Sequence, residues 1–377
     1  MTVAGLIFSN MHDQSIPEMT RMRTMASIPY GCRYRLIDFA LSNMVNSGIT
    51  NVGVITHYNY QSLMDHIGTG KDWDMARRSG GIKILPPYIT AYENSVAGKL
   101  YSNRLEALIG SANFIHRCGA DYIVLSDSDV VVNVDLTKVI RAHLESEAYL
   151  TLVTKAINVE RDLPNPTLKT VTYGEDLRID SIADCKNATG DVHASTNIMV
   201  IKRSDLQAVL ADAMAFGYDN FFRDVIAKQL DTRKICAYPI DTWCSGVDSL
   251  ESYFKSSMAL LEADVRRDLF GQSGRRIYTK IRNSAPTKYT EGATVKNSLV
   301  ADGCVIEGTV ENSILFRGVR VGRGTVVKNC ILLQDTFVGA NATLNCVISD
   351  KNVVIKDGRM LSGHETMPFF IGKDVTV

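Results

Sequence analysis

The sequence predicts an α/β domain followed by a left-handed parallel β-helix. Short apolar runs alternate with amphipathic segments over roughly the first 250 residues, which is typical of a mainly parallel sheet covered by helices. The composition changes after about residue 255, and aliphatic residues then recur at a nearly constant spacing. With 377 residues, 45% hydrophobic and 22% charged, the chain is long enough for two or three domains, each with its own core.

The charge and cysteine content exclude several classes of function. Lys and Arg number 41 and so do Asp and Glu, so no net charge favours a nucleic-acid partner, which would require clustered cations. The eight cysteines form no C-x-x-C pair and are too sparse for a disulfide scaffold, which favours a reducing compartment. The start, MTVAGLIFSN, has only a short apolar run and predicts a buried strand, not a signal peptide or membrane anchor. We expect a cytoplasmic protein with no membrane partner.

Four β-rich runs are expected to be strands of the α/β domain. They are VAGLIF near the start, NVGVITHY from Asn51, ADYIVLSDSD from Ala120 and YLTLVTKA from Tyr149. The amphipathic segments 35–48 and 104–118 predict helices between them. Because ligands bind beyond the carboxyl ends of parallel strands, SNMHD after the first run and SDSD at the end of the third should border a pocket.

A helical stretch, LESYFKSSMALLEADVRRDLF, and a basic segment, GQSGRRIYTKIRNSAPTKY, lead into the repeat region. Two series of aliphatic residues then recur with spacings of 15, 17 and 17: Val295, Val310, Val327 and Leu344, and Ile306, Val321, Val338 and Ile355. This spacing predicts a left-handed parallel β-helix of about 18 residues per coil, with an antiparallel meander as the alternative. The expected domains are 1–255, a helical and basic connector at 256–290, and the β-helix with a C-terminal tail at 291–377.

Side chains on the β-helix surface suggest two further features. Four asparagines should stack at one corner, where Asn tolerates a left-handed backbone and forms a hydrogen-bond ladder: Asn297, Asn312, Asn329 and Asn345. The flanks of a short β-helix invite packing against another domain or subunit, and three residues are expected on such a flank: Phe316, Leu333 and Phe337. We therefore expect an oligomer.

Residues 30–50, YGCRYRLIDFALSNMVNSGIT, closely resemble the YRLIDFxLSNxxNSGI signature of bacterial ADP-glucose pyrophosphorylases (glucose-1-phosphate adenylyltransferases). Further segments are also similar: NVGVITHYNYQSLMDHIGTGKDWD, ILPPY, DYIVLS and DGCVIEGTVENSILFRGVRVG. The resemblance implies a Rossmann-like nucleotidyltransferase (GT-A-like) domain with a C-terminal left-handed parallel β-helix. It also implies a reaction that joins glucose 1-phosphate to ATP, releases pyrophosphate and forms ADP-glucose for glycogen synthesis. Mg²⁺ and cationic side chains would hold the developing charge.

The family's phosphate-binding loop and lysine are altered in this chain. The loop resembles GGxGTRL in the family, whereas residues 9–16 contain no glycine, and Asn10 and Met11 stand within them. Ser15 stands in place of the arginine, and Asp13 adds negative charge where a polyphosphate should lie. The lysine of a KPA-like motif is replaced by Met25, which offers no charge.

The family's metal-binding aspartates are altered as well. In the segment resembling LSGDH, Ser128 stands at the metal position between Asp127 and Asp129. Strand alternation should turn these two carboxylates away from the site unless a bulge restores one of them. In the segment resembling WKDVGT, Ser245 is followed by an acid only at Asp248, which is expected to cap the next helix.

Losses at separate parts of one mechanism resemble the second, GlgD-type subunit found beside an active pyrophosphorylase subunit. The resemblance implies a regulatory chain with no catalytic residue, no metal site and no cofactor, Mg²⁺ being expected only in the catalytic partner. It also implies assembly with that partner, usually as a heterotetramer, with a homo-oligomer of the chain alone as an alternative. Residual ligand contacts are expected from Arg21, Arg23, Asp127, Asp129 and Ser195.

The connector suggests a contact for a phosphorylated sugar or nucleotide effector at Arg275, Arg276 and Lys280, with a solvated basic face as the alternative. Three other functions stay open. One is an active pyrophosphorylase with rearranged metal and phosphate ligands, and another is a sensor that binds a sugar phosphate or nucleotide without turnover. The third, a β-helix acyltransferase, is disfavoured because no histidine occurs in the coils from 293 to 358.

Overall fold

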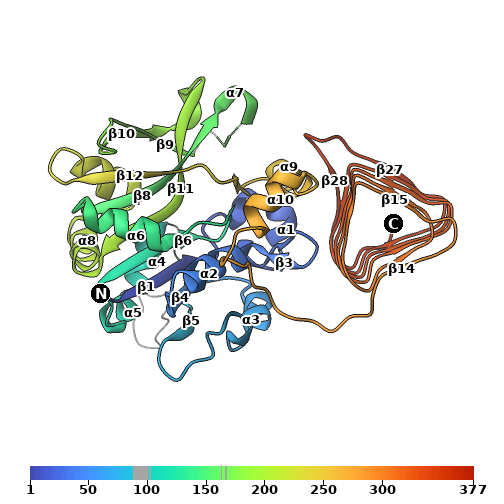
Figure 1. Ribbon diagram of the computed structural model, residues 1–377, viewed down its shortest axis with the longest axis horizontal. Coiled ribbons are helices and arrows are strands. Elements are labelled where there is room, and N and C mark those ends of the chain that lie inside the picture. The colour runs from blue at the N-terminus through green and yellow to red at the C-terminus, as the bar shows by residue number, and fades with distance from the viewer. Residues whose placement is uncertain (88–100, 102, 163, 166–167) are drawn as a thin grey trace.

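The computed structural model describes residues 1–87, 101, 103–162, 164–165 and 168–377 (Figure 1). Tyr88, the last residue of ILPPY, lies outside these ranges.

A nine-stranded sheet forms the centre of the first part of the chain (Figure 1). Its strands are β1 (Val3–Phe8), β4 (Asn51–Ile55), β5 (Gly81–Leu85), β6 (Tyr122–Asp127), β8 (Leu150–Asn158), β9 (Lys169–Tyr173), β10 (Ile179–Asp184), β11 (Asp191–Lys202) and β12 (Ile235–Ile240). The order is β10-β9-β11-β6-β1-β4-β5, and β8 pairs with β11 and β12. Strands β6, β1, β4 and β5 are parallel, but β11 runs antiparallel to β6, β8 and β9. The α/β class is confirmed, although the sheet is mixed and not mainly parallel.

Helices cover both faces of this sheet. They are α2 (Leu36–Asn46), α3 (Gln61–Ile67) and α6 (Leu136–Glu145) on one face, and α4 (Arg104–Gly110), α5 (Ala112–Arg117) and α8 (Arg203–Phe216) on the other. The other helices are α1 (Pro17–Thr20), α7 (Val159–Asp162), α9 (Leu250–Ala259) and α10 (Ala263–Phe270). Alternation along β1 turns Leu6 and Phe8 toward α4, α5 and α8, whereas Ile7 packs in the core formed with α2, α3 and α6. Two short ribbons, β2 (Pro29–Tyr30) with β3 (Tyr34–Arg35) and β7 (Val130–Val132) with β13 (Cys244–Gly246), lie beside the sheet.

The helix predicted at 104–118 is divided into α4 and α5 at Ser111. Gly110 ends α4, and a Cβ on it would lie 2.6 Å from the Tyr101 ring. The Ser111 hydroxyl donates to the Ala107 carbonyl at 2.9 Å, within the last turn of α4. The close approach of Tyr101, which no periodicity reveals, accounts for the glycine at this break.

Three parallel five-stranded sheets form the left-handed β-helix, seen end-on in Figure 1. The first contains β14 (Lys288–Tyr289), β17 (Val305–Ile306), β20 (Arg320–Val321), β23 (Phe337–Val338) and β26 (Val354–Ile355). The second contains β15 (Thr294–Lys296), β18 (Thr309–Glu311), β21 (Val326–Lys328), β24 (Thr343–Asn345) and β27 (Met360–Ser362). The third contains β16 (Leu299–Val300), β19 (Ile314–Leu315), β22 (Ile331–Leu332), β25 (Val347–Ser349) and β28 (Phe369–Ile371).

Both predicted aliphatic series pair in register from coil to coil. Val295 lies beside Val310, and the pairing continues through the rest of its series; Ile306 begins the second series in the same way. Because these side chains stack along the axis, they form the β-helix core. The meander is therefore wrong, and the β-helix is confirmed.

The asparagine corner is confirmed for the first coils and shifts in the last. Asn297, Asn312 and Asn329 have φ of 42°, 46° and 50°, and the Asn297 amide donates to the Asn312 side-chain oxygen at 2.8 Å. Asn329 donates to Asn345 at 3.0 Å, yet Asn345 ends β24, and Cys346 takes the left-handed backbone there with φ of 51°.

We expect Asn312→Ala to destabilise the protein by about 1–2 kcal/mol, because a Cβ-bearing residue without a local hydrogen bond pays roughly that cost in the left-handed region. Asn312→Gly should lose less, since glycine adopts φ of 46° freely. Urea unfolding of the two variants measures the difference. Equal losses would assign the effect to the side-chain ladder instead of the backbone.

The flank formed by β16, β19, β22, β25 and β28 packs against the first part of the chain, where α9 and α10 lie (Figure 1). Phe316 and Leu333 are buried in a cluster that also contains Tyr253 and Leu269 from these helices. The expected flank residues therefore contact a domain of the same chain. Phe337 differs, since it is 43% exposed.

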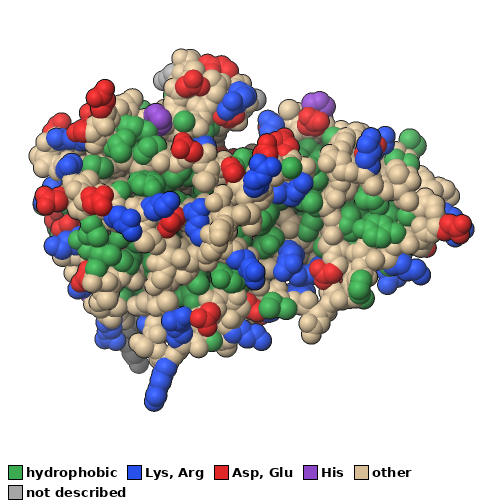
Figure 2. All heavy atoms as spheres, viewed as in Figure 1, with side chains coloured by type: hydrophobic (Ala, Val, Ile, Leu, Met, Phe, Trp, Pro, Cys, Tyr) green, Lys and Arg blue, Asp and Glu red, His purple; other side chains and the backbone are tan. Residues whose placement is uncertain are grey.

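The surface is mixed in charge. On the face shown in Figure 2, acidic and basic side chains are interspersed, in keeping with the zero net charge. Among the described residues, no helix has both the length and the apolar content needed to cross a bilayer.

Candidate functional site

The segment that follows β1 is held by its own side chains. The Asn10 side-chain oxygen accepts from the hydroxyls of Ser9 and Thr56, both at 2.7 Å, and from the backbone N–H of His57 at 3.2 Å. The Asn10 amide nitrogen donates to Asp13 at 2.5 Å. Asn10 therefore fixes this segment where the family's loop relies on glycines.

Asp13 also accepts a hydrogen bond that a bound anion could otherwise accept. One carboxylate oxygen takes the backbone N–H of Met25 at 2.7 Å, and burial raises the pKa of the Asp13 carboxyl to about 6. The Met25 side chain is 1% exposed and packs in the core. Ser15 is exposed, and Met11 packs partly against the core around β1.

Asp127, Asp129 and His12 come together at the carboxyl ends of β6 and β1. The ring nitrogen of His12 bonds to Asp129, and one ligand atom from each of the three side chains lies within 4.8 Å of the others. The two carboxylates lie together, as strand alternation predicts for the positions on either side of Ser128. The chain bends at residues 128–129 after β6 ends, and Asp127 and Asp129, two positions apart, share a side.

Arg104 completes this cluster and was not found from the sequence. Its guanidinium donates to Asp127 at 2.7 Å, is 7% exposed, and stacks over the Phe8 ring at 4.7 Å. Arg104 is the first residue of α4, and no motif marks it. The cluster contains two carboxylates, one guanidinium and one imidazole, so its charges balance when His12 is protonated.

The pKa values reflect this pairing. The Asp129 carboxylate raises the pKa of His12 to about 9, against the opposing effect of burial. Burial raises the pKa of Asp127, although Arg104 opposes the shift. The cations here are thus engaged with carboxylates.

Ser128 and Ser245 are the residues predicted to replace the family's metal-binding aspartates. Ser128 is 2% exposed, and its N–H donates to Phe8 at 3.2 Å. Ser245 lies in β13, opposite Val131 of β7. The expected cap at Asp248 is wrong, because Ser249 caps α9 by accepting the Ser252 N–H at 3.0 Å.

The predicted residual contacts are spread over several places. Arg23 faces the β-helix, where its guanidinium donates to both Asp350 oxygens at 2.9 Å. Arg21 is exposed. Ser195 lies 4% exposed at a bulge in β11 and accepts the Asn197 N–H at 3.1 Å.

The connector cations contact neighbouring parts of the protein. Arg275 donates to the Gln272 side chain at 2.9 Å, and Lys280 donates to the Asp65 carbonyl. Arg276 is exposed. None of these three cations forms an ion pair with another described residue.

A second group of cations, also missed from the sequence, surrounds Asp350 where the two parts of the chain meet. Burial lowers the pKa of Lys351 to about 7, helped by Arg35, Arg23 and Arg282 and opposed by Asp350. Burial likewise lowers the pKa of Arg35 to about 10. Asp350 therefore lies among several cations, and Asp38 and Asp65 also oppose the lowering of the Arg35 pKa.

Lys351 makes the stability of this junction depend on pH. In the unfolded chain the pKa of Lys351 is near 10.5, so between pH 7 and 10.5 the unfolded chain binds a proton that the folded chain does not. The free energy of unfolding therefore increases as the pH rises through this range. The free energy of unfolding, relative to that of Lys351→Met, should rise by about 1 kcal/mol per pH unit above pH 7. Urea denaturation at several pH values measures this. A constant difference would contradict the burial of Lys351.

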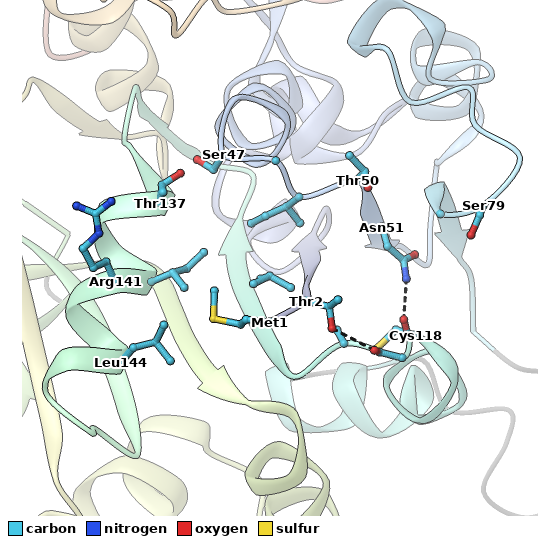
Figure 3. Close-up of a pocket in the computed structure, with 17 residues that line it drawn as sticks. Met1, Thr2, Ser47, Thr50, Asn51, Ser79, Cys118, Thr137, Arg141 and Leu144 are labelled. Atoms are coloured by element: carbon cyan, nitrogen blue, oxygen red, sulfur yellow. Dashed lines mark hydrogen bonds between the residues drawn. The ribbon is translucent and has the colours of Figure 1, made fainter.

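A cavity of about 590 Å³ lies at the opposite edge of the sheet, at the amino ends of β1, β4 and β6 (Figure 3). Thr2, Thr50, Asn51, Thr137 and Arg141 are among its lining residues. The cluster of His12, Asp127 and Asp129 does not border it.

Comparisons with known proteins agree with both parts of the fold. The family model described as nucleotidyl transferase matches residues 17–165, and the GlmU-like, C-terminal hexapeptide model matches 284–366. The chain is 33% identical to the glycogen biosynthesis protein GlgD of Bacillus subtilis (strain 168), over 98% of this chain and 95% of that protein. It is 30% identical to the glucose-1-phosphate adenylyltransferase of Clostridium perfringens (strain SM101 / Type A), over 89% of this chain and 85% of that protein. It is 31% identical to the glucose-1-phosphate adenylyltransferase of Bacillus thuringiensis (strain Al Hakam), over 91% of this chain and 90% of that protein.

Proposed function

The chain belongs to the glucose-1-phosphate adenylyltransferase (ADP-glucose pyrophosphorylase) family of glycogen biosynthesis, and from this premise we propose that it is a regulatory, catalytically deficient subunit. In this proposal it assembles with a catalytic member of the family in the cytoplasm, as a heterotetramer, and raises the partner's activity. The proposed domains are the α/β domain at 1–255, the helical and basic connector at 256–290, and the β-helix with its C-terminal tail at 291–377.

The observation that carries the proposal is the internal pairing of charge beside the first loop. Phosphoryl and nucleotidyl transfer need cations directed at the phosphates. Here His12 bonds to Asp129 and Arg104 to Asp127, so these cations already neutralise the protein's own carboxylates. A triphosphate would have to displace them and approach Asp13 as well.

Two further observations support the loss of turnover. Asn10 and Asp13 engage N–H groups of the first loop and its neighbours, which a phosphate would otherwise use. Ser128 and Ser245 offer hydroxyls where the family's metal needs carboxylates. The changes affect both phosphate binding and metal binding, and this combination favours a catalytically deficient chain.

Activation of a partner requires a contact that differs between the partner's states. A subunit that bound active and inactive conformations equally would shift nothing. The proposed phosphorylated sugar or nucleotide effector would meet Arg275, Arg276 and Lys280 and would act by changing that contact.

The test is reconstitution with the catalytic subunit of the same organism. ADP-glucose formation is measured for the catalytic subunit alone and with increasing amounts of this chain, while native mass spectrometry follows the assembly. The proposal expects a mixed oligomer and an increase in kcat or a decrease in KM that saturates at fixed stoichiometry. No mixed oligomer, or a mixed oligomer with unchanged kinetics, would overturn the regulatory role.

A further inference from the structure

His12, Asp127 and Asp129 have the spacing of metal ligands. Their three ligand atoms lie within 4.8 Å of one another. An ion bonded at about 2.0–2.2 Å to nitrogen and oxygen holds its ligand atoms roughly 3–4 Å apart, so only a small contraction would be needed.

The second observation is a pair of buried carboxylate oxygens without partners. Asp127 and Asp129 are 2% and 7% exposed, and one oxygen of each makes no hydrogen bond to a described residue. Leaving a buried charged oxygen without a partner is unfavourable, because the atom has lost its water and gained no hydrogen bond. A cation between these oxygens would remove that cost.

The backbone fixes the ligands before an ion binds. Strands β1 and β6 pair in parallel with Phe8 opposite Asp127, so the segments that follow them leave the sheet side by side. Arg104 holds the other oxygen of Asp127 and orients the carboxylate, as outer partners do in metal sites. The imidazole is 39% exposed, which leaves a path from solvent.

The donor set selects the class of ion. Mg²⁺, which the family resemblance implies, prefers oxygen ligands in an octahedral shell, and its expected carboxylates are replaced by Ser128 and Ser245. One imidazole nitrogen with two carboxylates suits divalent first-row transition metals. The imidazole ligand therefore favours a transition metal ion over Mg²⁺ at these residues.

We infer that His12, Asp127 and Asp129 bind a divalent transition metal ion, such as Zn²⁺ or Mn²⁺, through residues other than those expected at the family's metal positions. On binding, the ring nitrogen of His12 gives its proton to solvent and bonds to the ion. This proposal departs from the sequence-based expectation of no metal in this chain. It goes beyond the proposed function, because it holds whether or not the chain turns over.

The test uses the full chain, freed of metal by chelation. Zn²⁺ binding is followed by calorimetry and Mn²⁺ binding by electron paramagnetic resonance, for the wild type, His12→Gln and Asp129→Asn. His116→Gln is the matched control, since His116 lies in α5 and pairs with Gln207. Circular dichroism verifies that each variant is folded.

We expect one ion per chain, bound more tightly for Zn²⁺ than for Mn²⁺. The affinity should fall by more than about 100-fold in His12→Gln and Asp129→Asn, because losing a direct ligand costs more than losing an outer-shell partner, and should stay unchanged in His116→Gln. No stoichiometric binding of either ion, or equal binding by wild type and His12→Gln, would overturn the site. Because no activity is measured, this result is independent of the reconstitution experiment.

Discussion

Asp350→Ala is expected to destabilise the protein by about 3–5 kcal/mol, the usual cost of removing one partner from a buried ion pair. Arg23 and Asp350 are 4% and 5% exposed in their side chains, and both carboxylate oxygens accept from the Arg23 guanidinium. Without Asp350, Arg23 stays buried beside Lys351 and Arg35 with no compensating charge. Urea unfolding of the wild type and the variant measures the loss.

Two controls make this prediction specific. Asp264→Ala removes an Asp that pairs with Arg267 on the exposed face of α10 and should cost less than about 1 kcal/mol. The double variant Arg23→Met with Asp350→Leu should recover much of the loss, because an apolar pair of similar size needs no charge balance. A loss below about 1 kcal/mol for Asp350→Ala would show that the junction does not depend on this pair.

Arg104→Met should destabilise the protein by a similar amount, about 3 kcal/mol, because it leaves the Asp127 carboxylate without its cation at 2% exposure. It also removes the stacking over Phe8. Arg267→Met, at an exposed pair, is the matched control and should be nearly neutral. Thermal and urea unfolding measure both.

A second change separates charge from packing at this position. Adding Asp127→Asn to Arg104→Met removes the unpaired negative charge and should recover part of the stability. If the double variant were as unstable as the single one, the loss would come from packing against Phe8, and the internal neutralisation would lose its main support.

The β-helix was predictable because its aliphatic core residues recur at a regular spacing in the sequence. Val295 and Ile306 begin series whose spacings translate directly into neighbouring coils. The left-handed corner keeps the same spacings of 15, 17 and 17 through Cys346, and the prediction erred in the last coil because it followed the asparagine at 345, one residue before the period. Local propensity likewise placed the strands but not the break at Gly110, which depends on a ring from outside the helix.

The candidate site was only partly predictable because its contacts join distant residues. The replacements at Met25, Ser128 and Ser245 could be read from motifs. Alternation places Asp127 and Asp129 on one side, but their convergence with His12 depends on the pairing of β1 with β6 and on the bend after β6, which no motif marks. Arg23 and Asp350, separated by 327 positions, carry no sequence signal of their contact.

The central claim is that this chain does not itself form ADP-glucose, and the direct test is an assay of the purified chain alone. ATP, glucose 1-phosphate and Mg²⁺ are supplied, and ADP-glucose is measured by chromatography beside the catalytic subunit at equal concentration. Catalytic deficiency predicts formation indistinguishable from that of a sample without protein. Sustained turnover by the lone chain, lost in Asp127→Asn or Asp129→Asn, would contradict the claim and establish an active pyrophosphorylase with rearranged ligands.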